Sequence, residues 1–188
     1  MLSNECGQNI IFDCTASEDI SRLHPSWLRR GVHVITANNT GLSGSSSLRR
    51  DISTAETSFT DGVDPGMYLR EVCVAGSLPV IRTITDLLNS GDRIKKIDGI
   101  LSVSLSYIMH RVSPPPSASG DIPQGCKFSE AIKEAIELGM MEKDPEKDLN
   151  NEYTARCLMV LVKELGLETL WDTDRIIAAS DKIYGGKR

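Results

Sequence analysis

Two short apolar runs near the N-terminus constrain the fold more than any other feature. One run covers residues 9–14 (N-I-I-F-D-C), the other covers residues 32–36 (V-H-V-I-T), and a segment with helical spacing lies between them. Strands that are joined by a helical crossover run parallel in one sheet, and a parallel sheet is normally covered on both faces. The two runs therefore predict a βαβ unit with buried strands, which is the building block of a doubly wound α/β fold.

The segment between the runs predicts a crossover helix from Ser17, a good N-cap, to about Arg30, with Gly31 ending it. Pro25 is either absorbed near the start of a turn or divides the helix in two. The residues expected on its inner face are Ile20, Leu23, Trp27 and Leu28. Downstream, apolar spacing predicts helices near residues 48–55 and 79–91, a strand over 68–74, and one or two strands over 94–108.

Composition excludes several classes of protein. The formal net charge is −5 with no basic run, which argues against a nucleic-acid or anionic-membrane surface. No apolar run is long enough to span a membrane, and no signal peptide is visible. The 5 cysteines form no CxxC pair, which favours reduced thiols in the cytoplasm, or in the plastid stroma after removal of a transit peptide. Cys14 and Cys73 are expected in the core.

An acidic loop over residues 140–149 is the first candidate site. It carries Glu142, Asp144 and Asp148 between two predicted helices. The first helix is expected to begin at Ser129 and to end at Gly139, and the second to begin at Asn150 or Asn151 and to end at Gly166. Carboxylates held at helix ends can bind an ammonium group or a metal ion, although a solvated acidic linker has the same spacing. No two histidines share a helix face, so no zinc site is expected, and His33 is interpreted as a packed side chain.

Five ordered segments resemble the homoserine dehydrogenase family, and together they cover roughly residues 9–170. The matching segments are D-C-T-A-S at 13–17, G-V-H-V-I-T at 31–36, E-V-C-V-A-G-S-L-P at 71–79, G-I-L-S-V-S-L-S-Y at 99–107, and the stretch from Gly139 to Arg156. The resemblance implies an α/β chain in which residues 1–67 form the second half of a Rossmann-like nucleotide-binding domain, without its glycine-rich N-terminal unit. Residues 68–188 would form an α+β substrate and dimerisation domain with a Pro/Gly/Ser-rich insertion at 113–126.

The resemblance also implies an activity. Members of the family interconvert L-homoserine and L-aspartate 4-semialdehyde with NADP or NAD, in threonine and methionine biosynthesis. Carried over residue by residue, the family pattern assigns the substrate ammonium group to Glu142 and Asp148, and the cofactor to Thr15, Asn38 and Gly139. It assigns a monovalent cation such as sodium to backbone carbonyls of Glu71, Val74, Gly76 and Leu78, where an ordinary strand-to-helix turn is the alternative. Further expectations are a homodimer with an interface near residues 97–109, and a chain that is the interior of a longer polypeptide, either with or without a fused kinase domain.

Three positions depart from the family pattern. Asn39 and Cys157 stand where the resemblance places lysines, and Tyr153 stands where it places an aspartate. A lysine can donate a proton to a carbonyl oxygen as hydride arrives, whereas an amide or a thiol is a poor substitute at neutral pH. The sequence therefore assigns no catalytic residue, although Tyr153, Lys143 and Lys147 are conceivable donors. Two alternatives to the enzyme remain: an inactive relative that serves as a dimerisation or regulatory module, and a Rossmann-type dehydrogenase for another amino acid.

Overall fold

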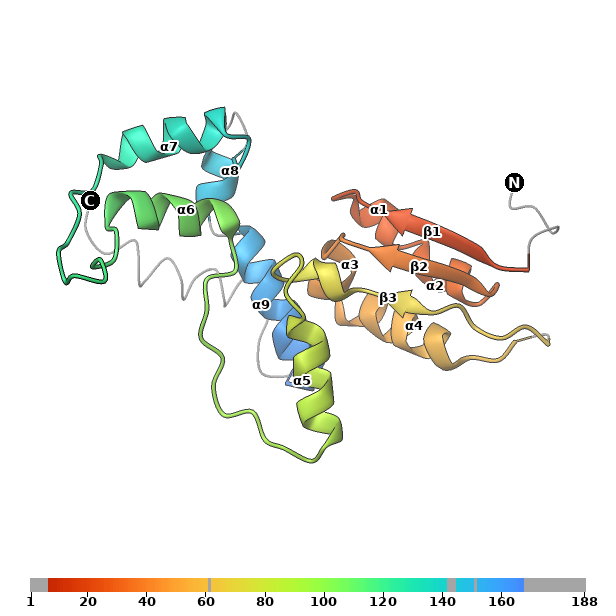
Figure 1. Ribbon diagram of the computed structural model, residues 1–188. Helices are drawn as coiled ribbons and strands as arrows, with labels where there is room; N and C mark the ends of the chain where they lie inside the picture. The colour runs from red at the N-terminus through yellow and green to blue at the C-terminus, as the bar shows by residue number, and fades with distance from the viewer. Residues whose placement is uncertain (1–6, 61, 142–144, 151, 168–188) are drawn as a thin grey trace. The chain divides into compact units, whose positions relative to one another are not determined.

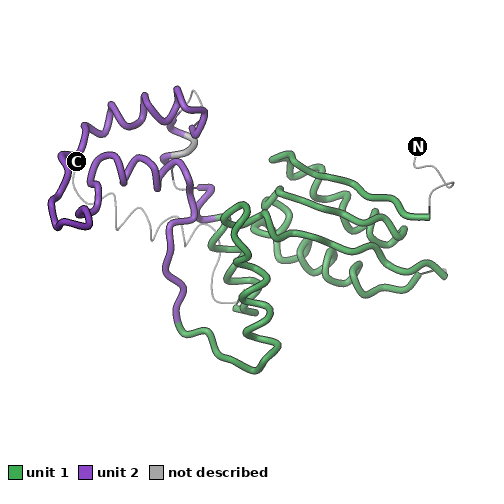
Figure 2. Tube along the Cα trace, in the orientation of Figure 1, with its two compact units in different colours: residues 1–95, 156–176 green, residues 96–155, 177–188 purple. Residues whose placement is uncertain are grey.

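The computed structural model describes residues 7–60, 62–141, 145–150 and 152–167. These residues fall into two compact units, which Figure 2 distinguishes by colour. Unit 1 contains residues 7–95 together with 156–167, and unit 2 contains Lys96–Ala155. The boundary between the two functional domains near residue 67 stays a prediction, since the compact units divide the chain elsewhere.

Unit 1 is built on a parallel sheet, as the sequence predicted. Its strands are β1 (Asn9–Asp13), β2 (Val32–Thr36) and β3 (Tyr68–Leu69), in the order β1-β2-β3. In the register of the sheet, Asp13 lies beside Thr36 and Val34 lies beside Tyr68. Because side chains alternate between the two faces of a strand, this register puts Asp13, Thr36 and Tyr68 on one face.

The crossover between β1 and β2 is divided at Pro25. It forms α1 (Glu18–Ser21) and α2 (His24–Leu28), with Pro25 in the first turn of α2, where its missing N–H is not needed. The hydroxyl of Ser17 accepts from the N–H of Ile20 at 3.4 Å, which confirms the predicted cap. Leu28 is fully buried as expected, whereas Leu23, which was predicted to face inward, is 45% exposed because it lies at the junction of the two short helices.

Only one face of the sheet is covered by described residues. Figure 1 shows α2 and α4 (Ser46–Thr57) on the same side of the strands, and Val32 and Val34 are buried on that side. On the opposite face Ile10 is 51% and Phe12 is 68% exposed. The expectation that β1 is buried on both faces is therefore wrong for the described residues, and Cys14 is exposed rather than in the core, whereas Cys73 is buried as predicted.

The chain after β3 forms a tight turn rather than the strand that was predicted over 68–74. The 3₁₀ helix η1 (Glu71–Cys73) follows β3, and α5 (Val80–Asn89) begins after the turn. The two carboxylate oxygens of Glu71 accept from the N–H groups of Ile81 and Arg82, each at 2.9 Å. Glu71 therefore caps α5, and this capping contact favours a turn over a continued strand.

Within unit 1, charged groups hold the C-terminal end of α9 (Glu152–Glu164) against α4 and the end of α3 (Thr40–Ser43). The buried carboxylate of Glu164 binds Arg70 at 3.1 Å and Arg49 at 3.2 Å. The guanidinium of Arg49 also donates to the carbonyl of Lys163 at 2.9 Å, and the Lys163 ammonium donates to the carbonyl of Gly44, which ends the short helix α3, at 2.6 Å. Cations at a helix C-terminus also interact favourably with its dipole.

The described part of unit 2 contains helices where strands were predicted. Residues 92–102 have no regular structure, and α6 (Val103–Val112) then packs on α7 (Phe128–Glu137), with α8 (Glu146–Leu149) nearby. Ile108 is fully buried in a cluster with Ala131, Ala135 and Met141. The prediction of strands over residues 94–108, and of a dimer interface made of such strands, is therefore wrong. A strand needs a hydrogen-bonded neighbour, and the described residues of unit 2 offer none.

The helix ends of this region were predicted with mixed success. Helix α7 begins after Lys127, whose N–H donates to the Glu130 carboxylate at 3.2 Å, and not at Ser129. Gly139 and Gly166 have positive φ angles of 68° and 71°, which confirms both as helix-ending residues. The carbonyl of the Asn150 side chain accepts from Glu152 N–H at the start of α9, as predicted. No helix among the described residues is long and apolar enough to cross a membrane.

The close approach of the chain to β2 at Gly66 gives the first prediction. A Cβ atom at this position would lie 2.0 Å from the carbonyl oxygen of Val32, which is backbone and cannot move aside. We expect Gly66→Ala to lower the free energy of unfolding by about 3 kcal/mol, as for overpacked interiors. Gly7→Ala, where nothing lies within 4 Å of the added Cβ, is the control. Urea titration followed by circular dichroism measures both, and equal midpoints would contradict the packing at Gly66.

The ion pairs of Glu164 give the second prediction. Its side chain is 7% exposed, and Arg70 and Arg49 both bind it, so Glu164→Gln removes the carboxylate that two partly buried guanidinium groups share, although Arg70 keeps Glu56 at 3.5 Å. We expect a loss of about 3 kcal/mol in the free energy of unfolding, because removing one partner of a buried ion pair is strongly destabilising. The control is Glu18→Gln, which removes the exposed pair with Arg22 and should cost far less, because solvent screens an exposed ion pair. A loss no larger than that of the control would show that the Glu164 pairs contribute little.

Candidate functional site

The carboxyl ends of β1 and β2 meet in unit 1 and form the candidate site. In open parallel sheets ligands bind in the crevice outside this edge. Thr15 follows β1 and is exposed, whereas Asn38 and Asn39 follow β2 and are 2% and 6% exposed. We call Asp13, Thr15, Asn38 and Asn39 the strand-end site.

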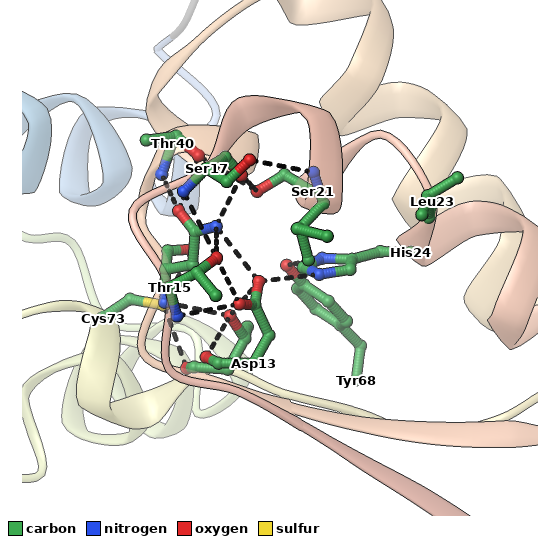
Figure 3. A network of polar contacts seen from close by, with 12 residues as sticks. Asp13, Thr15, Ser17, Ser21, Leu23, His24, Thr40, Tyr68 and Cys73 are labelled. Carbon is green, nitrogen blue, oxygen red and sulfur yellow. Dashed lines mark hydrogen bonds and ion pairs between the residues drawn. The ribbon is translucent and has the colours of Figure 1, made fainter.

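The buried carboxylate of Asp13 binds both loops of this site. Its Oδ1 accepts from the backbone N–H of Thr15 at 2.9 Å and from the Thr15 hydroxyl at 2.7 Å. Its Oδ2 accepts from the amide of Asn38 and from Nε2 of His24, both at 3.0 Å (Figure 3). The Thr36 hydroxyl lies 3.5 Å from the same oxygen. One side chain thus holds the loop after β1 and the loop after β2 in fixed positions.

The protonation states of this network follow from its surroundings. Burial alone would raise the pKa of Asp13, but hydrogen bonds from Thr15 and Asn38 and the nearby His24 outweigh it, so the pKa lies below its ordinary value. Burial lowers the pKa of His24 more strongly than Asp13 raises it. At neutral pH the network therefore contains an ionised Asp13 and a neutral His24. Burial also raises the pKa of Tyr68, whose hydroxyl lies 3.2 Å from Nδ1 of His24, so Tyr68 keeps its proton.

The sequence did not reveal the pair formed by His24 and Tyr68. His24 begins α2 and Tyr68 begins β3, and both are buried beneath the strand-end site. The only signal was indirect: a histidine directly before Pro25 at a helix start, and an aspartate ending an apolar strand. His33, interpreted as a packed side chain, accepts from the N–H of Met67 at 2.9 Å, which is a structural role.

The two positions where the resemblance places lysines lie side by side in unit 1. The amide of Asn39 donates to the sulfur of Cys157 at 3.7 Å, and the Cys157 thiol donates to the carbonyl of Cys73 at 3.7 Å. The Cys73 thiol in turn donates to the carbonyl of Thr36 at 3.2 Å. Burial raises the pKa of Cys73 to about 12, so this thiol is protonated at neutral pH and is a poor nucleophile.

The remaining residues predicted for the substrate and cofactor sites lie in unit 2 or outside the described residues. Tyr153 lies on the first turns of α9, 41% exposed, and Gly139 ends the segment after α7, both in unit 2. Glu142 and the side chain of Asp148 lie outside the described residues. The predicted substrate site and its relation to the strand-end site therefore remain predictions.

The predicted cation site falls on the turn between η1 and α5. Ala75 and Gly76 both have positive φ angles, 56° and 59°, and the carbonyl of Leu78 accepts from Val80 N–H at 2.8 Å. Because the Glu71 carboxylate is committed to capping α5, Glu71 has its backbone carbonyl to offer a cation. Among the described residues no three His, Cys, Asp or Glu side chains come together as a metal site, so a cation here would depend on carbonyls.

Comparison with known proteins gives one consistent answer. Residues 79–177 match the family model described as homoserine dehydrogenase.

The chain belongs to the homoserine dehydrogenase family.

A homoserine dehydrogenase from Emericella nidulans is 34% identical over 167 residues, which are 89% of this chain and 43% of the relative. A chloroplastic bifunctional aspartokinase/homoserine dehydrogenase from Arabidopsis thaliana is 35% identical over 161 residues, 85% of this chain and 16% of the relative. The chain thus spans less than half the length of these curated members of the family.

Solved structures agree on the fold. A Candida auris protein of unknown function superposes with a TM-score of 0.71 and 28% identity, covering 94% of this chain and 51% of that one. A hyperthermophilic archaeal homoserine dehydrogenase in complex with NADPH superposes with a TM-score of 0.63 and 22% identity, covering 88% and 49%. The second likeness supports the parallel-sheet α/β fold alone.

The buried His24 gives a prediction for stability against pH. Its pKa is lowered from 6.5 in the folded chain, so at lower pH the unfolded chain takes up a proton that the folded chain refuses. The free energy of unfolding should therefore fall as the pH drops from about 7 to 5, by at most about 1.4 kcal/mol per pH unit for this one proton. Denaturant titrations of the wild type and of His24→Gln at several pH values measure the contribution. The same slope in both proteins would show that His24 does not titrate as proposed.

Proposed function

We propose that this chain forms part of a homoserine dehydrogenase that interconverts L-homoserine and L-aspartate 4-semialdehyde with NADP or NAD. The observation that carries the proposal is the arrangement of Thr15, Asn38, Asn39 and Cys157, which come from three segments of the chain and gather at the carboxyl ends of parallel strands. That edge is where dinucleotides bind in folds of this class.

The strand-end site fits the nicotinamide end of the cofactor. The residues exposed there are small, namely Cys14, Thr15, Ala16 and Ala37, so a flat ring can approach the backbone. Thr15, Asn38 and Gly139 are the residues proposed to position it, by direct contact or through the loops that they hold in place. When bound, the cofactor supplies or accepts the hydride. The chain's own contribution is to orient that end of the cofactor and to keep buried groups around it in fixed protonation states.

The substrate is proposed to bind through Glu142 and Asp148, whose carboxylates suit its ammonium group by charge-assisted hydrogen bonds. A monovalent cation such as sodium is proposed at the carbonyls of Glu71, Val74, Gly76 and Leu78. The assembly is proposed to be a homodimer in the cytoplasm or plastid stroma, and exposed apolar side chains of unit 2 such as Ile100 and Val103 are surfaces that a second copy would cover. The α+β character of the substrate domain belongs to the same proposal.

One observation favours a second candidate, an inactive relative that acts as a dimerisation or regulatory module. Asn39 and Cys157 are in contact and buried, and neither carries the positive charge that a lysine would bring to a carbonyl oxygen as hydride arrives. A third candidate, a dehydrogenase for another amino acid, is supported by Tyr153 at the position of an acid.

NADPH oxidation with L-aspartate 4-semialdehyde distinguishes these candidates. If the proposal holds, the full-length protein that contains this chain turns over, and Glu142→Ala in that protein raises KM by roughly 10- to 100-fold, because a hydrogen bond to a charged group contributes about 1.5–3 kcal/mol. Glu137→Ala, which removes an exposed acid at the end of α7, is the control and should leave KM unchanged.

Two outcomes would contradict the proposed enzyme. A folded wild type that does not oxidise NADPH, together with activity in the Asn39→Lys, Cys157→Lys double variant, supports the inactive relative. Turnover of another semialdehyde or keto acid at a higher kcat/KM than aspartate semialdehyde supports the third candidate.

A further inference from the structure

The hydroxyl of Thr15 has no proton to donate to a ligand. Its single proton goes to Asp13, and the oxygen accepts from the N–H of Ser17 at 3.2 Å. The amide nitrogen of Asn38 lies 3.3 Å from the same oxygen. Thr15 therefore presents mainly its methyl group and its backbone carbonyl to a ligand, and how it presents them depends on Asp13.

Asn38 is likewise committed to the protein. Its amide nitrogen donates to Asp13 and to the carbonyl of Ser17 at 2.8 Å, and its carbonyl accepts from the N–H and the hydroxyl of Thr40 at 3.1 and 2.6 Å. The side chain joins the loop after β1 to the start of α3. Any effect of Asn38 on a ligand is thus exerted through the loops that it holds together.

His24 holds Asp13 from the opposite side. Its ring is fully buried, so water cannot replace a lost partner. Nε2 faces the ionised Asp13 and must donate, which leaves Nδ1 of the neutral ring to accept the Tyr68 hydroxyl at 3.2 Å. The tautomer, and with it the direction of the ring, is fixed by two partners that come from β1 and β3 (Figure 3).

We propose that His24 is a positioning residue of the strand-end site: held by Tyr68, it fixes the Asp13 carboxylate, which presents Thr15 and the loop after β1 to the ligand. This inference rests on the proposed function for the identity of the ligand, a nicotinamide dinucleotide. The effect of His24 on Thr15 is independent of the proposed function, because it can be measured in the chain alone. Without His24, Oδ2 keeps only Asn38 at 3.0 Å and Thr36 at 3.5 Å, and Asp13 can rotate away from Thr15.

Amide hydrogen exchange of Thr15, measured by NMR, tests the effect directly. Thr15 is exposed, so its N–H is protected by the bond to Asp13. His24→Phe should raise the exchange rate of this amide about tenfold relative to amides of β2, which corresponds to losing roughly one hydrogen bond. His24→Gln keeps an N–H donor and should restore slow exchange. His33→Gln, a histidine on the same sheet that binds Met67 N–H, is the matched control and should change nothing at Thr15.

Tyr68→Phe is a second variant, which tests the proposal if His24→Phe does not fold. It removes only the hydroxyl that Nδ1 binds, and it should raise Thr15 exchange by a smaller factor, about threefold, because His24 then keeps one of its two partners. Unchanged Thr15 exchange in a folded His24→Phe, or in Tyr68→Phe where His24→Phe does not fold, would overturn the proposal. So would a uniform rise across all amides of unit 1 in both variants, because that pattern is global destabilisation rather than positioning.

NADPH titration, followed by nicotinamide fluorescence, separates this inference from the proposed function. The expected result is about tenfold weaker binding in His24→Phe and wild-type affinity in His24→Gln and His33→Gln. If the wild type does not bind NADPH but Thr15 exchange responds to His24 as described, the proposed ligand is wrong and the positioning role stands. If the wild type binds NADPH and His24→Phe binds it equally well, the positioning role is wrong and the proposed function stands.

Discussion

The ionised carboxylate of Asp13 is the constraint on which unit 1 depends. At 2% exposure it has lost nearly all its water, and a buried charge is tolerated only when protein groups replace that water completely. Thr15, His24, Thr36 and Asn38 supply the donors. These residues lie on two loops, on α2 and on β2, so the carboxylate is stable only when all four segments are in place. This requirement holds the carboxyl ends of β1 and β2 in one arrangement, although the described residues cover only one face of the sheet.

Local patterns predicted the parts of the fold that local forces determine. The β1–β2 pair, the Ser17 cap and the helix-ending residues Gly139 and Gly166 follow from alternation, capping and the freedom of glycine at positive φ. The prediction for residues 101–107 was wrong because Leu, Val, Leu and Tyr alternate there with serines, and this alternation has the period of a strand. There the hydroxyl of Ser102 caps a helix instead, accepting from Leu105 N–H at 3.3 Å, and packing against α7 fixes the choice.

The sequence predicted the site residues that match the family pattern, but not those that come together only through tertiary contacts. Asn39 and Cys157 are 118 residues apart, and only the family pattern linked them before the structure placed one beside the other. His24 and Tyr68 are 44 residues apart and belong to no local pattern, so the sheet register and the start of α2 were needed to bring them together. Hydrogen bonds among buried polar groups are set by tertiary structure, and sequence spacing carries almost no information about them.

The contact between Asn39 and Cys157 has an energetic consequence beyond the lost proton donors. Two lysines at these positions would put like charges side by side in a place where the side chains are 6% and 0% exposed. Such a pair raises the free energy of the folded chain, because burial and repulsion both disfavour the charged forms. This cost favours a site that stays hydrated or open to a charged ligand. An amide and a thiol carry no charge and can close against each other and against the Cys73 carbonyl. An amide and a thiol, in place of the two lysines that the resemblance puts at these positions, should therefore stabilise this part of unit 1, the direction expected when charged groups are exchanged for packing.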